Sequence, residues 1–71
     1  MDILKLVRMA RQIEINLPPG DDLPHKLAAH LDTFWTPSMR TQLYQHVVGN
    51  RADFGYQVQQ ALDELHHQGK A

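Results

Sequence analysis

The sequence predicts an all-α fold, a compact bundle of three to four short helices, on the strength of three observations. Apolar residues recur three and four positions apart in four separate segments, which is the spacing of one helix face. Proline, glycine, threonine and aspartate separate these segments, at positions where they commonly cap or end helices. No segment shows the alternating, β-branched pattern that is typical of a strand. The connections are short, which favours neighbouring antiparallel helices, and residues 1–71 are expected to form a single helical domain.

The first predicted helix follows Asp2, a candidate N-cap, and runs to about Leu17. Its core side is a stripe of apolar residues: Ile3, Leu6, Val7, Ala10, Ile13 and Leu17. Glu14 falls inside this stripe in projection. A lone buried carboxylate is costly, so we expect Glu14 at the rim of the core or beside an arginine. Pro18-Pro19-Gly20 then ends the helix.

The second predicted helix begins at Asp21 or Asp22, either of which can cap it, and has Pro24 in its first turn. The residue before a proline avoids the α region, so Pro37 is expected to make the second helix end near Trp35. Its apolar face comprises Leu23, Leu27, Ala28, Leu31, Phe34 and Trp35.

The segment 34–40 predicts a tight corner between the second and third helices. Thr36 can accept a hydrogen bond from the free N–H groups of a new helix. Pro37 suits the first helical position, where its missing N–H costs nothing. Phe34 and Trp35 place two large aromatic rings at the bend. These rings must be buried, either in the core of this chain or in a partner.

The third and fourth helices follow from the same rules. Met39, Leu43 and Val47 form the stripe of the third helix, and Gly49-Asn50 supplies a left-handed residue to end it. Asp53 is expected to cap the fourth helix, whose apolar residues are Phe54, Val58, Ala61, Leu62 and Leu65. The segment 66–71 is polar and is predicted to be a frayed tail.

Composition excludes several classes of function. The chain has no cysteine, which excludes disulfides, iron–sulfur clusters and thiolate zinc sites. A formal net charge of -1 provides no broad field for nucleic acid or for an anionic membrane. The segment 38–48, which follows the corner, carries one arginine and no lysine, whereas a recognition helix usually makes more phosphate contacts. No apolar run has the length of a signal peptide or a transmembrane helix, so a soluble, cytoplasmic chain is expected.

The five histidines are the candidates for chemistry. His25 and His30 are five positions apart and lie on different helix faces, whereas a helical metal pair is four apart. His66 and His67 diverge by about 100° on a helix. His30 and His46 border apolar stripes and could meet if their helices pack, or each ring could lie at the core edge and bond to a carbonyl. We favour the second reading, and expect no metal site, cofactor or catalytic residue, because the nucleophile, phosphate loop and carboxylate pair of common mechanisms are missing.

The sequence favours a partner-binding surface over a metal or catalytic site. Arg8 and Gln12 lie one turn apart on the outer face of the first helix, and Trp35, Met39 and Arg40 gather at the corner. Tryptophan, arginine and methionine are enriched in protein interfaces. Arg40 can present its planar fork to a carboxylate while the aromatic corner shields it from water. The alternatives are solvated surface charge for the arginines and a core position for Trp35.

Two motifs in this order and at this spacing resemble the delta subunit of NAD-dependent, molybdenum-containing formate dehydrogenases. The first is Lys5-Leu6-Val7-Arg8-Met9-Ala10, followed by Gln12-Ile13. The second is His30-Leu31, Phe34-Trp35, Pro37, Met39-Arg40, Leu43 and His46. The resemblance covers most of positions 4 to 48. The chain departs from the family pattern at Arg11 and Ser38, and in the turn and the stretch before its last helix.

The resemblance implies an accessory subunit of a cytoplasmic enzyme that oxidises formate with NAD as acceptor. The molybdenum, pterin, flavin and iron–sulfur centres of that enzyme belong to its larger subunits, and the delta chain would aid assembly, stability or cofactor insertion of the large molybdenum subunit. The isolated chain could also form a homo-oligomer. The alternative function is a free-standing, homodimeric helical regulator or nucleic-acid adaptor. Whether neighbouring reading frames encode a molybdopterin-dependent large subunit would separate the two.

Overall fold

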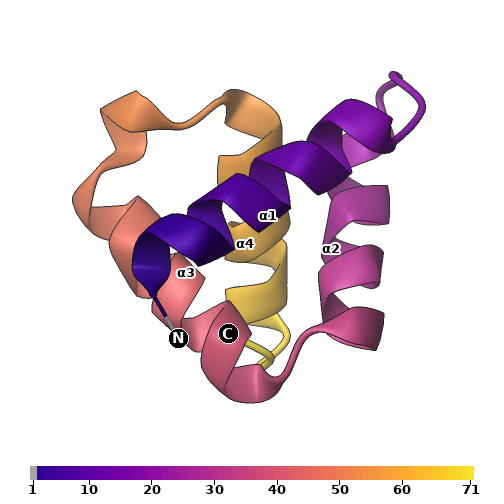
Figure 1. The fold of residues 1–71 in the computed structure, drawn as a ribbon. Helices are drawn as coiled ribbons and strands as arrows, with labels where there is room; N and C mark the ends of the chain where they lie inside the picture. The colour runs from indigo at the N-terminus through magenta and orange to yellow at the C-terminus, as the bar shows by residue number, and fades with distance from the viewer. Residues whose placement is uncertain (1) are drawn as a thin grey trace.

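A computed structural model, which describes residues 2–71, shows four α-helices and one 3-10 turn (Figure 1). In chain order the elements are α1 (Ile3–Asn16), α2 (Leu23–Phe34), α3 (Pro37–Gly49), η1 (Arg51–Asp53) and α4 (Tyr56–His67). No strand occurs within residues 2–71, so the predicted all-α class is confirmed.

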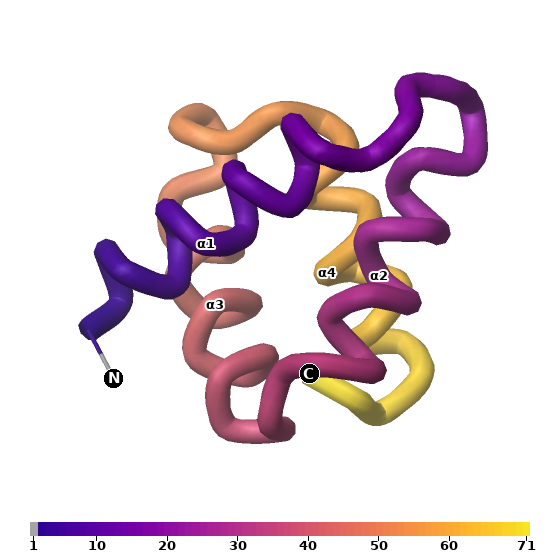
Figure 2. The backbone as a smooth tube through the Cα atoms, turned by 45° about the vertical axis from the view of Figure 1, so that its right-hand side comes forward, coloured from indigo at the N-terminus to yellow at the C-terminus, as the bar shows by residue number. Residues whose placement is uncertain are grey.

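The helices α2, α3 and α4 run in alternating directions, as the short connections predict (Figure 2). As a result α2 and α4 run side by side in the same direction, and α1 crosses over the bundle (Figures 1 and 2). All four helices contribute to one core. Its largest fully buried side chains are Leu6, Leu27, Leu31, Leu43, Val47, Leu62 and Leu65.

Two predicted N-caps are confirmed. The Asp2 carboxylate accepts a hydrogen bond from the Leu4 N–H at 3.1 Å. The Thr36 hydroxyl accepts one from the Met39 N–H at 3.2 Å, and Pro37 is the first residue of α3. Each oxygen satisfies an N–H that has no partner inside its own helix, so these two helix starts are specified locally.

Two other predicted caps make no capping hydrogen bond, although Asp22 does occupy the N-cap position of α2. Asp22 precedes α2, but its side chain makes no capping bond and pairs with Lys26 at 3.3 Å instead. Asp53 belongs to η1, and α4 begins after Gly55, which has no side chain to offer. The extra turn of η1 still delivers Phe54 to the core, where it is buried. The start of α4 therefore has no side-chain cap, and the residue two positions before it is anchored in the core by its ring.

The ends of α3 and α4 also differ from expectation. α3 ends at Gly49 without a left-handed residue, and the Asn50 side chain donates to the His46 carbonyl at 2.9 Å. α4 continues through His67 and closes in a turn at Gly69, whose φ is 76°. Here the Lys70 N–H donates to the Leu65 carbonyl at 2.8 Å, and the Gly69 N–H donates to the His66 carbonyl at 3.0 Å. This pair of bonds is a Schellman motif, so residues 66–71 form a defined turn where a frayed tail was predicted.

Candidate partner-binding surface

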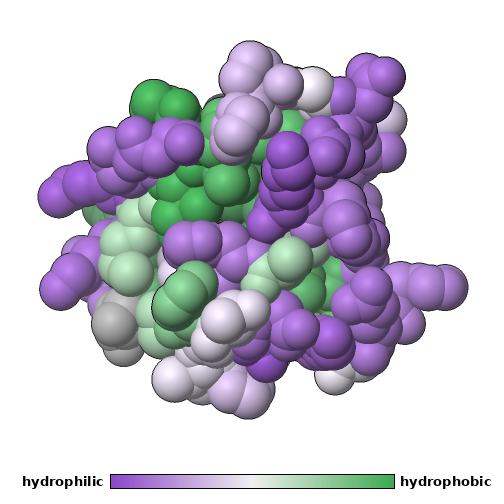
Figure 3. Space-filling model, turned by 90° about the vertical axis from the view of Figure 1, so that its right-hand side faces the viewer, coloured by the Kyte–Doolittle hydropathy of each residue, from purple (hydrophilic) through white to green (hydrophobic). Residues whose placement is uncertain are grey.

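An open groove of about 480 Å³ lies between α1 and the α2–α3 corner. We call it the corner groove. Its α1 wall is formed by Met9, Gln12, Ile13 and Asn16, and its opposite wall by His30, Phe34, Trp35 and Met39. The lining is mostly apolar. Figure 3 looks onto the side of the molecule that carries α2, and shows apolar surface gathered in its upper left part among polar side chains.

Phe34 and Trp35 have opposite environments. Trp35 is 6% exposed and belongs to the core, whereas Phe34 is 71% exposed. Consecutive residues diverge by about 100° at a helix end, and here Trp35, at the C-cap of α2, takes the core position while Phe34 lies outside it. The prediction that Phe34 belongs to the core face of α2 is therefore wrong for this chain alone. Its ring contacts only the edge of the fold, where it tilts against His30 with 4.6 Å between ring centroids.

A second hollow, of about 330 Å³, lies on the outer side of α1. We call it the outer hollow, and it is lined by Leu4, Val7, Arg8, Arg11, Gln12 and Ile15. Gln12 borders both hollows. Leu4 and Ile15 are 63% and 75% exposed. The outward face of α1 therefore joins the two hollows into one continuous surface.

This surface brings together four of the residues expected to bind a partner. Arg8 and Gln12 are exposed on α1, and Trp35 and Met39 line the corner groove as buried and half-buried side chains. Their proximity depends on how α1 crosses the bundle. The periodicity of each helix shows which residues point outward, but carries no information on this crossing.

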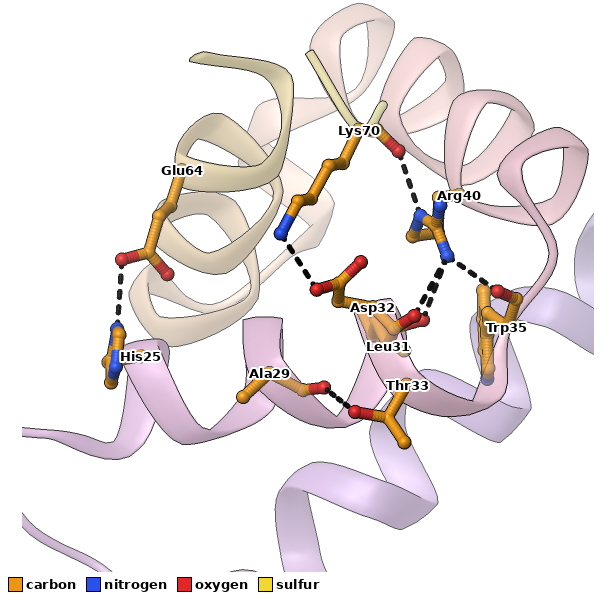
Figure 4. A network of polar contacts seen from close by, with 9 residues as sticks. All are labelled: His25, Ala29, Leu31, Asp32, Thr33, Trp35, Arg40, Glu64 and Lys70. Carbon is orange, nitrogen blue, oxygen red and sulfur yellow. Dashed lines mark hydrogen bonds and ion pairs between the residues drawn. The ribbon is translucent and has the colours of Figure 1, made fainter. Parts of the chain in front are cut away.

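Arg40 lies elsewhere than expected. It is 6% exposed, and its guanidinium points into the fold (Figure 4). Its Nη1 donates to the backbone carbonyls of Leu31, Asp32 and Trp35, and its Nε donates to the Lys70 carbonyl at 2.8 Å. The expected fork toward a partner carboxylate is thus engaged with backbone oxygens of its own chain.

The position of Arg40 has a clear physical reason. The last carbonyls of a helix have no partner inside that helix and carry the negative end of its dipole. Arg40 supplies a cation and several donors to that end of α2. Within residues 2–71 no buried side-chain nitrogen or oxygen lacks a hydrogen-bond partner. Sequence reasoning missed this role because it depends on α3 folding back onto the end of α2.

An ion pair beside Arg40 was also missed. The Lys70 ammonium donates to the Asp32 carboxylate at 2.8 Å (Figure 4). This hydrogen bond, together with the charges of Lys70 and Arg40, holds the pKa of Asp32 below its ordinary value, although desolvation opposes the shift. The pair fixes the turn after α4 to the end of α2.

Four of the five histidines, His25, His30, His46 and His66, have separate partners. His46 meets the edge of the Phe54 ring at 5.7 Å, and His66 stacks on Tyr44 at 4.2 Å. His25 contacts the Glu64 carboxylate at 3.0 Å, and His30 contacts Phe34. In the part of the chain that the structure describes, no three histidine or carboxylate side chains cluster as a metal site would require. None of the described helices has both the length and the apolar character needed to cross a membrane.

Comparison with known proteins identifies the family. The family model of the NADH-dependent formate dehydrogenase delta subunit, FdsD, matches residues 5–62. The match runs from α1 into α4, which confirms the resemblance seen in the two motifs and extends it beyond position 48. No curated protein and no solved structure matches the chain. Since the family model covers most of its length, the chain belongs to the family of NADH-dependent formate dehydrogenase delta subunits.

Proposed function

We propose that this chain is a non-catalytic accessory subunit of a cytoplasmic NADH-dependent formate dehydrogenase complex. The proposed partner is the large molybdenum-containing subunit, whose assembly, stability or cofactor insertion the chain would support. The observation that carries the proposal is the family match over residues 5–62. As a member of this family, the chain associates with other subunits of the complex.

The side-chain chemistry fits a binding role. His25, His30, His46 and His66 each pack on an aromatic ring or contact another group of their own chain. The sequence contains no cysteine, so the chain has no thiolate to offer a metal centre. By contrast, α1 and the corner present two adjoining hollows with exposed large apolar side chains, which is a common feature of protein interfaces. We assign Arg8, Gln12, Trp35 and Met39 to this surface, with Arg40 supporting it from inside the fold.

The alternative of a nucleic-acid adaptor finds no support in the helix that follows the corner. Arg40 is the one arginine of α3, which has no lysine, and it is buried against backbone carbonyls. It is therefore not available to a phosphate group. A recognition helix without an accessible cation has little to hold it in a groove of DNA.

Deletion and add-back test the proposal. The chain is tagged and co-expressed with the other subunits of its complex, and a matched strain lacks the chain. We expect the tagged chain to co-purify with the large subunit. The complex made without it should show less bound molybdenum or a lower yield of the large subunit, together with less formate-dependent NAD⁺ reduction. The two readouts separate a role in cofactor insertion from one in stability.

Two results would overturn the proposal. One is a tagged chain that purifies without the large subunit. The other is a complex made without the chain that retains full molybdenum content, subunit yield and activity. Formate oxidation by the purified chain alone would overturn its non-catalytic role.

A further inference from the structure

Most lysines and arginines of this chain form an ion pair or a side-chain hydrogen bond, but two do not. Three of the seven lysines and arginines form ion pairs, namely Lys26, Arg51 and Lys70. Arg40 is bonded to carbonyls, and Arg11 donates to the Asp53 carbonyl at 3.0 Å. Of these seven cations, all of which lie within residues 2–71, only Lys5 and Arg8 make neither an ion pair nor a side-chain hydrogen bond. Both lie on the outward face of α1.

Most of the exposed large apolar residues border the two hollows that α1 lines. Of the five large hydrophobic side chains exposed on the described surface, Leu4, Ile15 and Phe34 border the corner groove or the outer hollow. Lys5 is one helical turn from Met9, and Arg8 is one turn from Gln12. Arg8 therefore lies in the outer hollow beside Leu4 and Ile15, and Lys5 lies one turn from the corner groove on the same helix.

We propose that this surface binds an acidic amphipathic helix of another subunit of the complex. Apolar side chains of that helix would enter the corner groove against Phe34 and Met39, and its carboxylates would meet Lys5 and Arg8. From Leu4 to Asn16 the surface follows about 18 Å of α1, which about three turns of a partner helix cover. This inference rests on the proposed function, since it names the kind of element that the chain binds.

The structure favours a helix over an extended peptide. The described chain has no strand, and hence no sheet edge to which an extended segment could add by main-chain hydrogen bonds. The corner groove instead lies between a helix and a helical corner, where apolar side chains from a third helix can pack between theirs. Recognition by anchors spaced three and four residues apart suits this shape.

The charges favour a different chain over a second copy. A two-fold dimer through this surface would bring two identical patches together, so Lys5 and Arg8 of both copies would share one interface. Like charges at an interface are unfavourable. An acidic partner removes this repulsion and satisfies both cations.

The first experiment measures the affinity of the full-length chain for the complex purified without it. We expect Phe34→Ala to weaken binding by about tenfold or more, and Arg8→Gln by about fivefold. Two matched variants serve as controls and should stay within about twofold of the wild type. Tyr56→Ala removes an aromatic ring that is 67% exposed elsewhere. Gln45→Glu makes the net charge more negative by one unit, as Arg8→Gln does, at an exposed position of α3.

Salt gives an independent readout of the acidic partner. Raising ionic strength from about 0.05 M to about 0.5 M should weaken binding of the wild type, and should weaken binding of Arg8→Gln by a smaller factor. Unchanged melting temperatures of the four variants would show that the fold is intact. Equal salt dependence of the wild type and Arg8→Gln would overturn the charge part of the inference.

A photo-cross-linker at position 34 identifies the occupant. We expect a cross-link to an acidic helical segment of another subunit. A cross-link to a second copy of this chain, or to a basic or non-helical segment, overturns the inference. If the wild-type chain fails to bind the complex, the proposed function itself fails. If it binds, but Phe34→Ala and Arg8→Gln behave as their controls do, only the inferred surface fails.

Discussion

Arg40 is the residue on which three distant parts of the chain converge. Arg40 lies in the first turn of α3. Its guanidinium donates to carbonyls at the end of α2 and to the carbonyl of Lys70 after α4 (Figure 4). A planar guanidinium suits this role because its donors point in several fixed directions and its charge persists when it is buried. Because one of the acceptors is the Trp35 carbonyl, Arg40 also fixes the backbone of the corner groove.

Replacing Arg40 should destabilise the free chain. Arg40→Ala removes the donor from the buried Trp35 carbonyl and from the part-buried carbonyls of Asp32 and Lys70, so we expect the free energy of unfolding to fall by about 2–4 kcal/mol. For a chain of this size the melting temperature should fall by more than about 10 °C. Urea denaturation and thermal unfolding, each followed by circular dichroism, measure the two quantities.

Two further variants separate geometry from charge. Arg40→Lys keeps the charge but loses the planar fork, so its stability should lie between those of Arg40→Ala and the wild type. Arg8→Ala, at an exposed position of α1, should change the free energy of unfolding by about 0.5 kcal/mol or less. An Arg40→Ala chain as stable as Arg8→Ala would show that the buried hydrogen bonds contribute nothing to the fold.

At the scale of helices, some helix ends are determined by nearby residues and others by contacts from distant parts of the chain. Asp2 and Thr36 are used where they are predicted, because the N–H groups that they satisfy lie within three residues. Asp22 and Asp53 have the right chemistry but are not used. Gly69 ends α4 in a turn that Arg40, Asp32 and the core hold in place. Such contacts come from far along the chain, so composition alone predicted a frayed tail.

One substitution at two glycines tests this difference between helix ends. Gly69 has a φ of 76°, which costs a residue with a Cβ about 1–2 kcal/mol, so Gly69→Ala should lower the free energy of unfolding by about 1 kcal/mol. Gly49 is helical, and a Cβ there would meet nothing within 4 Å. Gly49→Ala should therefore stabilise the chain, by about 0.5 kcal/mol.

Chemical denaturation of the two alanine variants beside the wild type measures both effects. Opposite signs are the expected result. A Gly69→Ala chain at least as stable as the wild type would mean that the turn after α4 is dispensable, as a frayed tail would be.

At the scale of the whole molecule, the sequence predicts the helices and most of the core, but not the surface between helices. Leu6, Leu27, Leu43 and Leu62 are buried as their periodicity predicts. The corner groove depends on how α1 crosses the bundle, and this crossing follows from the packing of all four helices together. Phe34 shows the same limit, because periodicity assigns it to the core and the end of α2 turns it outward. Residue type could thus nominate Arg8, Gln12 and Met39, whereas only the packed fold shows that they share one surface.

The ion pair between Asp32 and Lys70, which joins the end of α2 to the turn after α4, should make the stability of the whole molecule sensitive to acid. The hydrogen bond from Lys70 lowers the pKa of Asp32 from its ordinary value of about 3.8, so the folded chain favours the charged carboxylate more than the unfolded chain does. This contribution is fully present above the unfolded pKa and is lost as the pH falls through the folded one. The melting temperature of the wild type should therefore exceed that of Asp32→Asn by a constant amount between about pH 5 and pH 7, and the difference should shrink below about pH 4. Lys70→Met keeps the carboxylate but removes its donor, so it should lose most of this acid-dependent contribution, while the backbone carbonyl of residue 70 still accepts from Arg40. Thermal unfolding of the three chains across this pH range measures the effect, and a difference that stays constant below pH 4 would show that the Asp32–Lys70 pair does not couple the fold to protons.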